Sequence, residues 1–187
     1  AKPEEKTETA AETESEGDEQ AMPENFRELF AIEAEGIDYL SVEGIEVPEG
    51  TAISMIGKDS ASGFWKRVKA GAEQAVADIN EALGYTGNAK VKLTYDAPSK
   101  ENVSEQIDII DQMLDKNPDA LIVGYVDVNS GKTQLELAEA NGVPVFAVDS
   151  SIQNSLIETE TKTDNYKAAA EAADRLCEAI GDSGEVA

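Results

Sequence analysis

The sequence predicts an α/β protein in which a doubly wound parallel β-sheet is flanked by helices on both faces. Three observations lead to this fold class. From Thr51 onwards, short apolar segments alternate with longer segments of helical periodicity. Several short segments, such as "ALIVGYV" at 120–126, are apolar on both faces, which is typical of strands covered on both sides. Turn-forming stretches such as "GYTGN" and "NPD" separate the segments.

Five short segments are predicted to be strands, because they are rich in β-branched and other apolar residues. In chain order they are residues 51–57, 91–96, 120–126, 143–149 and 155–161.

Four longer segments are predicted to be helices, because their apolar residues recur at helical spacing. They are residues 64–83, 101–116, 131–141 and 165–180. The inward face of the first helix is predicted to carry Val68, Ala72, Ala75, Val76, Ile79 and Leu83. The inward face of the last is predicted to carry Ala169, Ala172, Ala173, Leu176 and Ile180, with Cys177 as a small core residue.

Composition excludes several classes of protein. The net charge of −24 disfavours nucleic acid and anionic lipid as partners. The chain has no His and one Cys, which excludes a His-based triad, a His-ligated metal and an internal disulfide framework. No metal or other cofactor is therefore expected. Any export signal is expected to have been removed or not included, because the start lacks the charged-then-apolar pattern.

The uneven charge suggests a division of the chain. Residues 1–21 are acidic, lack aromatic and branched apolar side chains in "AKPEEKTETAAETESEGDEQ", and are predicted to be a disordered linker. Residues 22–50 form a lead-in segment. Residues 51–162 form an N-terminal α/β lobe, and residues 163–187 form a hinge and the start of a second lobe.

Ligands of parallel sheets bind beyond the carboxyl ends of the strands. At that rim the sequence places carboxylates, hydroxyls and aromatic rings, with little positive charge. The residues concerned are Lys58, Asp59, Ser60, Phe64, Trp65, Asp96, Tyr125, Val126, Asp127, Asp149 and Ser150.

One interpretation of this rim is enzymatic. The segment "YVDVNSGKT" ends in Gly-Lys-Thr between a strand and a helix, as in a nucleotide-hydrolysing phosphate loop. That loop needs a first Gly where this chain has Val126, and Asp127 would direct a carboxylate at the phosphate. Gly131 can equally mark an ordinary helix start.

The other interpretation is binding of a neutral polyol. Aromatic rings cover the C–H faces of sugars and carboxylates accept hydrogen bonds from their hydroxyls. The candidate ligand contacts are Phe64, Trp65, Asp149, Ser150, Asp59, Tyr125 and Asp127. One ring of the Phe64–Trp65 pair can alternatively cap the core, and Asp149 can be a structural turn residue. If Trp65 lines the cleft, Trp65→Ala should weaken binding and leave folding largely intact.

Four runs in unbroken order resemble the ribose-binding type of periplasmic sugar-binding protein: "GFWKRVKAGAEQAV", "LIVGYVD", "GVPVFAVDSS" and "TDNYKAAAEAADRL". The resemblance covers about residues 51–187. It implies the type I periplasmic binding fold, with two lobes closing over a sugar. By resemblance the sugar stacks on Phe64 and Trp65 and its hydroxyls bind Asp149, while Asp164 and Asn165 lie near the hinge.

Two departures from that family leave the sugar unnamed. Ribose binders carry Arg after the binding Asp, and this chain has Ser150. The third strand ends in Gly124-Tyr125 in place of Asn-Pro.

The resemblance also implies a cellular role. The N-terminal lobe is nearly complete and the C-terminal lobe is truncated, so the chain is expected to be a fragment of an extracellular binding protein for an ABC importer. Its expected partners are a small-molecule sugar and the permease, with no nucleic acid, and it is expected to be a monomer. The acidic start resembles the linker after a lipidated Cys in Gram-positive relatives; a periplasmic location is the alternative. A sensory domain of the same fold is the other function left open.

Overall fold

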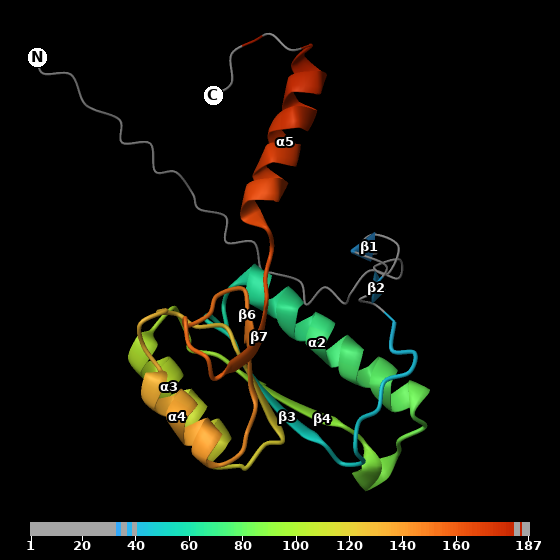
Figure 1. The fold of residues 1–187 in the computed structure, drawn as a ribbon, viewed down its shortest axis with the longest axis vertical. Helices are drawn as coiled ribbons and strands as arrows, with labels where there is room; N and C mark the ends of the chain where they lie inside the picture. The colour runs from blue at the N-terminus through green and yellow to red at the C-terminus, as the bar shows by residue number, and fades with distance from the viewer. Residues whose placement is uncertain (1–32, 35–36, 39–40, 182–183, 185–187) are drawn as a thin grey trace, which may run out of the picture.

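The fold is built on one parallel sheet (Figure 1). The structure is a computed structural model that describes residues 33–34, 37–38, 41–181 and 184. Five strands lie in the order β4-β3-β5-β6-β7, and every neighbouring pair is parallel. Their bounds are β3 Ala52–Ile56, β4 Lys92–Asp96, β5 Ala120–Val123, β6 Val145–Val148 and β7 Ile157–Thr161.

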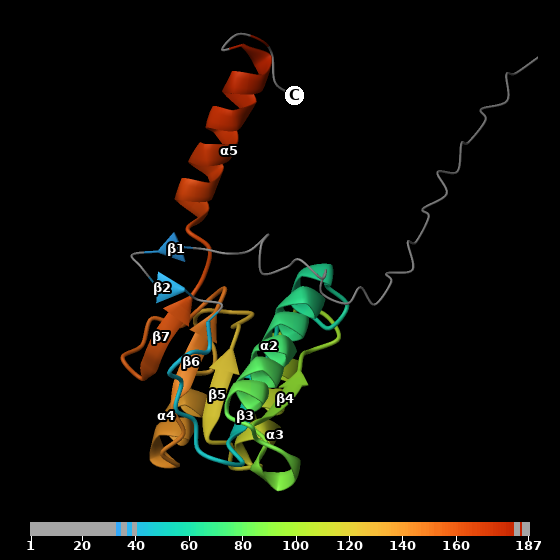
Figure 2. The same cartoon turned by 90° about the vertical axis from the view of Figure 1, so that its right-hand side faces the viewer.

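Helices connect the strands and lie on both faces of the sheet (Figure 2). They are α2 Gly63–Ala82, α3 Val103–Leu114, α4 Lys132–Ala140 and α5 Asn165–Ile180, with a short 3-10 turn η1 at Gly87–Ala89. The predicted α/β class, the five strands and the four helices are confirmed. The largest boundary difference is at β5, which ends at Val123 instead of residue 126.

The main core lies between the sheet and the pair α3–α4. In β5 and β6, Leu121 pairs with Val145 and Val123 with Ala147, so these side chains share one face. The largest fully buried side chains of this core are Ile56, Ile110, Leu121, Val123, Leu135 and Val145. Every second residue of the strands and the apolar face of α3 therefore pack together in a single apolar layer.

The opposite face is covered less completely. Helix α2 contacts β4, and among its residues only Trp65 is fully buried. Of its predicted inward face, Ala75 is exposed and the other positions are half-buried. On the same face of the sheet, Ile122, Phe146 and Val148 also remain half-buried, because α2 does not extend over that half of the sheet (Figure 2).

Helix α5 projects away from the sheet (Figure 1). Its predicted inward face is wrong for this structure: every residue of the helix is exposed, with Leu176 at 42% and Ile180 at 38%. Cys177, expected in a core, is exposed as well. The reason is geometric, since the connection after Thr161 directs the helix off the edge of the lobe.

Little of the predicted N-terminal region falls within the described residues. The predicted linker 1–21 lies outside them. In the lead-in segment, β1 (Glu33–Ala34) pairs antiparallel with β2 (Ile37–Asp38).

Candidate functional site

The candidate site is the edge of the sheet where the parallel strands end. Because β3, β5 and β6 run in the same direction, the segments that follow them meet at one edge (Figure 1). We call this edge the rim; it comprises residues 57–65, 124–131 and 149–151. Open parallel sheets bind ligands at this edge.

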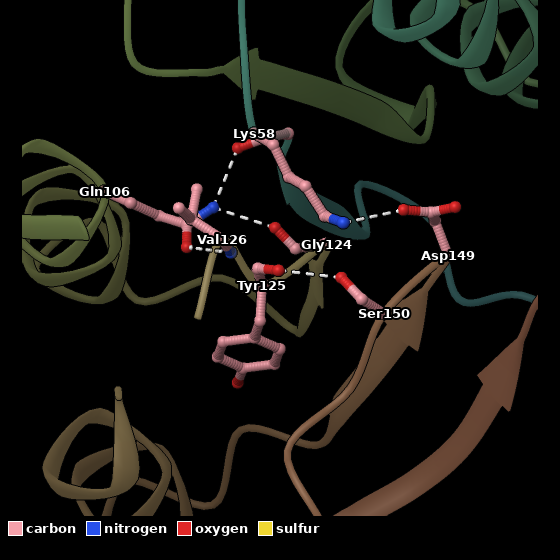
Figure 3. A network of polar contacts seen from close by, with 8 residues as sticks. Lys58, Gln106, Gly124, Tyr125, Val126, Asp149 and Ser150 are labelled. Carbon is pink, nitrogen blue, oxygen red and sulfur yellow. Dashed lines mark hydrogen bonds and ion pairs between the residues drawn. The ribbon is translucent and has the colours of Figure 1, made fainter. Parts of the chain in front are cut away.

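An ion pair crosses the rim from β3 to β6. The Lys58 Nζ lies 2.8 Å from the Asp149 Oδ2, and the two side chains are 16% and 39% exposed. Each residue lies just past the end of its strand, so their side chains meet above the sheet edge (Figure 3). From the sequence, Lys58 is expected at the rim but not as a ligand contact, and little positive charge is expected here. The structure therefore places a positive charge, the Lys58 ammonium, directly beside Asp149 at the rim.

Asp149 has an unusual backbone. Its φ is 65°, one of two positive values among the described non-glycine residues. Asp tolerates this left-handed conformation better than most residues. The conformation is held by two neighbouring bonds: the Asp149 N–H donates to the Thr161 carbonyl at 2.8 Å, and the Ser150 N–H donates to the Val148 carbonyl at 2.7 Å. Strain of this kind recurs at ligand sites, where surrounding structure keeps it in place.

Ser150 and Tyr125 tie two strand ends together. The Ser150 hydroxyl donates to the Tyr125 carbonyl at 2.7 Å, and the Tyr125 N–H donates to the Ser150 carbonyl at 3.2 Å (Figure 3). The Tyr125 side chain is 2% exposed, and its burial raises the pKa of the phenol. In this structure Ser150 and Tyr125 hold the segments after β5 and β6 together through these hydrogen bonds. As direct ligand contacts they stay predictions.

The two neighbouring aromatic residues have different environments. Phe64 is 54% exposed, while Trp65 is 3% exposed. Their rings meet edge to face, with centroids 5.4 Å apart and planes at 89°. Phe64 therefore offers a ring face at the rim, and Trp65 closes the apolar layer beneath it.

Trp65 is packed against two glycines at the ends of β3 and β5. A Cβ at Gly124 would lie 2.2 Å from the Trp65 ring, and a Cβ at Gly57 would lie 3.0 Å from it. The absence of side chains at these two positions makes room for the indole. This burial argues against the expectation that Trp65→Ala would leave folding largely intact, because the substitution would open a cavity. The role of Trp65 as a ligand contact stays a prediction.

Two predicted carboxylates are engaged by their own loops. Asp59 accepts from the N–H groups of Ala61 at 2.7 Å and Ser62 at 3.3 Å, just before α2. Asp127 accepts from the Asn129 N–H at 2.9 Å and the Ser130 hydroxyl at 2.9 Å. These bonds, the Asn129 N–H first, lower the pKa of Asp127. Both carboxylates order the rim loops, and their roles as ligand contacts stay predictions.

The same loop bears on the nucleotide-hydrolase alternative. The Asp127 carboxylate accepts from the Asn129 N–H and the Ser130 hydroxyl, two donors that would otherwise be open to a phosphate. Gly131 is the N-cap of α4, and its φ of 92° is a left-handed value that favours glycine for the backbone alone. Within the described residues, no group of three His, Cys, Asp or Glu side chains is placed to hold a metal ion.

A depression of about 640 Å³ opens beside Asp149. Its walls come from the end of β6 and from the β7–α5 connection, and they include Ser150 and the predicted hinge residues Asp164 and Asn165. Asp164 also caps α5, since its Oδ1 accepts from the Lys167 N–H at 3.0 Å. The connection that bears α5 thus borders the rim.

Comparisons with known proteins agree with this geometry. Residues 53–187 match the family described as "Periplasmic binding protein domain". The chain is 29% identical over 89 residues to the ribose import binding protein RbsB of Bacillus subtilis (strain 168), covering 48% of this chain and 29% of the relative. It is similar to the sugar-binding protein of a sugar ABC transporter from Bacillus halodurans, with 25% identity, a TM-score of 0.59 and coverage of 71% of this chain and 42% of that one.

Two further structures show the breadth of the similarity. A protein titled as an ABC transporter, LacI family transcriptional regulator from Brachyspira murdochii is 27% identical, with a TM-score of 0.58, over 71% of this chain and 40% of that one. LsrB from Clostridium saccharobutylicum, solved in complex with AI-2, shares the fold at 18% identity and a TM-score of 0.58, over 73% of this chain and 39% of that one. The chain thus spans less than half the length of these relatives.

Proposed function

The chain belongs to the periplasmic binding protein domain family, and from this premise we propose that it forms one wall of the sugar cleft in the substrate-binding protein of an ABC importer. Family membership makes it part of a ligand binder, and we propose that it performs no catalysis. The sugar would be held between the rim and a second lobe that follows α5.

The observation that carries the proposal is the grouping of Phe64, Lys58 and Asp149 at the rim. An exposed ring covers the C–H face of a sugar. At the same rim, the Asp149 carboxylate would accept from sugar hydroxyls and the Lys58 ammonium would donate to sugar oxygens. This arrangement offers one apolar surface and one polar pair of opposite charge, which suits a neutral polyol better than a charged ligand.

The ion pair also suits a site that closes. A carboxylate that is desolvated without a partner carries a large free-energy cost. Lys58 already lies at hydrogen-bonding distance from Asp149 in the open rim. Closure over a neutral sugar would then bury a compensated pair, and Asp164 and Asn165 in the α5 connection are the proposed hinge.

The pair also compensates for one departure from ribose binders. Ser150 cannot supply the positive charge that the family's Arg supplies after the binding Asp. Lys58 brings a cation to the same carboxylate from a different strand. The compact Lys58 ammonium, with three donors, takes the place of a planar arginine guanidinium. We therefore propose that the preferred sugar differs from ribose in its hydroxyl arrangement.

The proposal extends to the cellular setting. The partners would be the membrane subunits of the permease, with the binding protein acting as an extracellular monomer tethered as a lipoprotein or free in a periplasm. In the part of the chain that the structure describes, none of the helices has the length and apolar composition of a membrane span.

A thermal-melt screen of the full-length gene product tests the proposal. The panel is D-ribose, D-allose, D-tagatose, L-arabinose, a disaccharide, a nucleoside, AI-2 and magnesium-ATP. A ligand at about a hundred times its dissociation constant stabilises the folded state by roughly 2.7 kcal/mol. Stabilisation by one sugar class is expected; stabilisation by magnesium-ATP alone, or by no member of the panel, would contradict sugar binding.

A sensory role is the second candidate, and the likeness to the regulator from Brachyspira murdochii favours it. The same cleft would then report a sugar or AI-2 to a signalling protein. Pull-down with the ligand-loaded protein separates the two roles, because an importer component should capture permease subunits and a sensor should capture a kinase or regulator.

A further inference from the structure

Gln106 of α3 is a buried polar side chain in an otherwise apolar helix face. It is 3% exposed, and it shares its face with Ile109, Ile110 and Met113. Among the described residues only Ser54 and Ser151 are other buried polar side chains. A buried amide is costly unless its hydrogen-bonding groups are satisfied, so its partners explain why it is there.

The Gln106 amide makes three hydrogen bonds, all to backbone groups just past the ends of β3 and β5. Its Nε2 donates to the Gly57 carbonyl at 2.9 Å and to the Gly124 carbonyl at 2.8 Å. Its Oε1 accepts from the Val126 N–H at 2.9 Å (Figure 3). Only an amide supplies two donors and one acceptor in this geometry.

These bonds of Gln106 link the two strand ends beyond the last backbone hydrogen bond between β3 and β5. The last backbone bond between the two strand ends is the Gly124 N–H to the Ile56 carbonyl, at 2.9 Å. Beyond it the chains diverge, and Gln106 bridges them from the α3 side of the sheet. From the other side, the Trp65 ring is packed on Gly57 and Gly124. The two strand ends are therefore clamped between an amide and an indole.

The residues that Gln106 contacts directly precede the polar side chains of the rim. Lys58, which pairs with Asp149, follows Gly57, and Asp127 follows Val126. We propose that Gln106 is a positioning residue of the ligand site: it touches no ligand, but fixes the backbone from which Lys58 and the 126–131 loop extend. This inference rests on the proposed sugar-binding function and assigns part of the affinity to a residue beneath the site.

The test compares Gln106→Met and Gln106→Glu with the wild type in the full-length protein. Met keeps the length and removes all three hydrogen bonds; Glu keeps the shape and, ionised, removes both donors. Gln112→Met, at an exposed position of the same helix, is the matched control. Met113→Ala, at a buried position further along α3, serves as a control for destabilisation alone.

Affinity is measured by calorimetric titration with whichever of D-ribose, D-allose, D-tagatose or L-arabinose stabilises the wild type, well below every melting temperature. Gln106→Met should bind roughly tenfold more weakly and Gln106→Glu more weakly still, while Gln112→Met and Met113→Ala bind as the wild type does. Wild-type affinity in folded Gln106→Met, or an equal loss in Met113→Ala, would overturn the positioning role and leave sugar binding intact. If no sugar on this panel binds the wild type, sugar binding itself is contradicted.

A ligand-free measurement makes the test independent of the sugar. Fluorine NMR of 5-fluorotryptophan-labelled protein, with the Trp65 signal assigned by Trp65→Phe, reports on the clamped glycines. Gln106→Met should shift or broaden this signal, and Gln112→Met should leave it in place. An unchanged Trp65 signal in Gln106→Met would contradict the clamp.

Discussion

The α3–α4 side of the sheet and the rim are built from different chemistry. The first is a continuous apolar layer in which Ile110, Leu121 and Val123 are at most 1% exposed. The second is a set of short polar loops joined by hydrogen bonds between side chains and backbone. The two regions meet at the ends of β3 and β5, where Gln106 belongs to one and contacts the other.

The difference shows how this lobe separates stability from binding. Much of the polar chemistry at the rim is already used by the scaffold, as with Ser150, Asp59 and Asp127. The exposed ring of Phe64 and the Lys58–Asp149 pair are the rim groups to which we assign ligand binding. Substitutions in the packed layer should therefore change unfolding, and substitutions of the open groups should change binding.

The largest effect is expected at Trp65, which is buried on the α2 side of the sheet, next to the rim. Trp65→Ala should lower the free energy of unfolding by about 3–5 kcal/mol, because it leaves a cavity over two glycines that cannot fill it. Phe64→Ala, at an exposed position next to it, should cost about 1 kcal/mol or less, roughly the value of the lost edge-to-face contact. Chemical denaturation of the two variants measures both values. Equal losses would erase the distinction between the packed layer and the open rim.

The next effect is expected at Gly124, on the other side of the same contact. Gly124→Ala should destabilise by about 1–3 kcal/mol, because its Cβ would overlap the ring of Trp65, which is itself buried. Gly71→Ala, within α2 where a Cβ meets nothing within 4 Å, should stabilise by about 0.5–1 kcal/mol. Thermal melts of both variants check the signs, and a neutral Gly124→Ala would show that the indole is mobile.

A smaller effect is expected at Ser150. Ser150→Ala removes the 2.7 Å bond to the Tyr125 carbonyl and should cost about 1 kcal/mol. Ser155→Ala, at an exposed position, is the control and should cost less than about 0.5 kcal/mol. Denaturant titration compares the two. No loss at Ser150 would mean that its hydroxyl is free for a ligand, as the sequence analysis predicted.

The smallest effect at neutral pH is expected at Tyr95. Its hydroxyl is buried without a hydrogen-bond partner among the described residues, so Tyr95→Phe should be neutral or slightly stabilising at pH 7. Burial, followed by the charges of Asp96 and Asp59, raises the pKa of Tyr95 from 10.0 to about 12. Because the pKa of the phenol is higher in the folded state, its contribution to the free energy of unfolding is fully present below pH 10. This contribution is lost as the pH rises towards 12. Melts between pH 8 and pH 12 should therefore show a shallower decline in Tyr95→Phe, and identical slopes would contradict the burial of the hydroxyl.

The sequence predicted the fold well because its signals are local. Apolar runs and helical spacing located every strand and helix of the lobe within a few residues. The end of β5 was predicted too late, because Gly124-Tyr125-Val126 is apolar but bends away to meet Gln106. The inward face of α5 was predicted from periodicity alone, and periodicity does not show whether a surface is present to cover it.

The rim was predicted as a region, but not in its individual contacts. Strand order and direction brought Phe64, Asp149 and Ser150 to one edge, as expected. The partnership of Lys58 with Asp149 depends on β3 and β6 lying on either side of β5, which one sequence does not show. The burial of Trp65 depends on Gly57 and Gly124 coming together from different strands. One local signal for Gln106 existed, namely an amide in the middle of an apolar helix face.

We propose above all that a sugar binds at the rim through the Lys58–Asp149 pair. The most direct measurement is a calorimetric titration of full-length wild type and Asp149→Asn with the sugar that most stabilises the wild type, with Lys90→Met, at an exposed position before β4, as the control. Loss of a hydrogen-bonded charge at 39% exposure should weaken binding about tenfold or more, with little change in melting temperature, while Lys90→Met binds normally. Unchanged affinity in Asp149→Asn would place the sugar elsewhere and contradict the site.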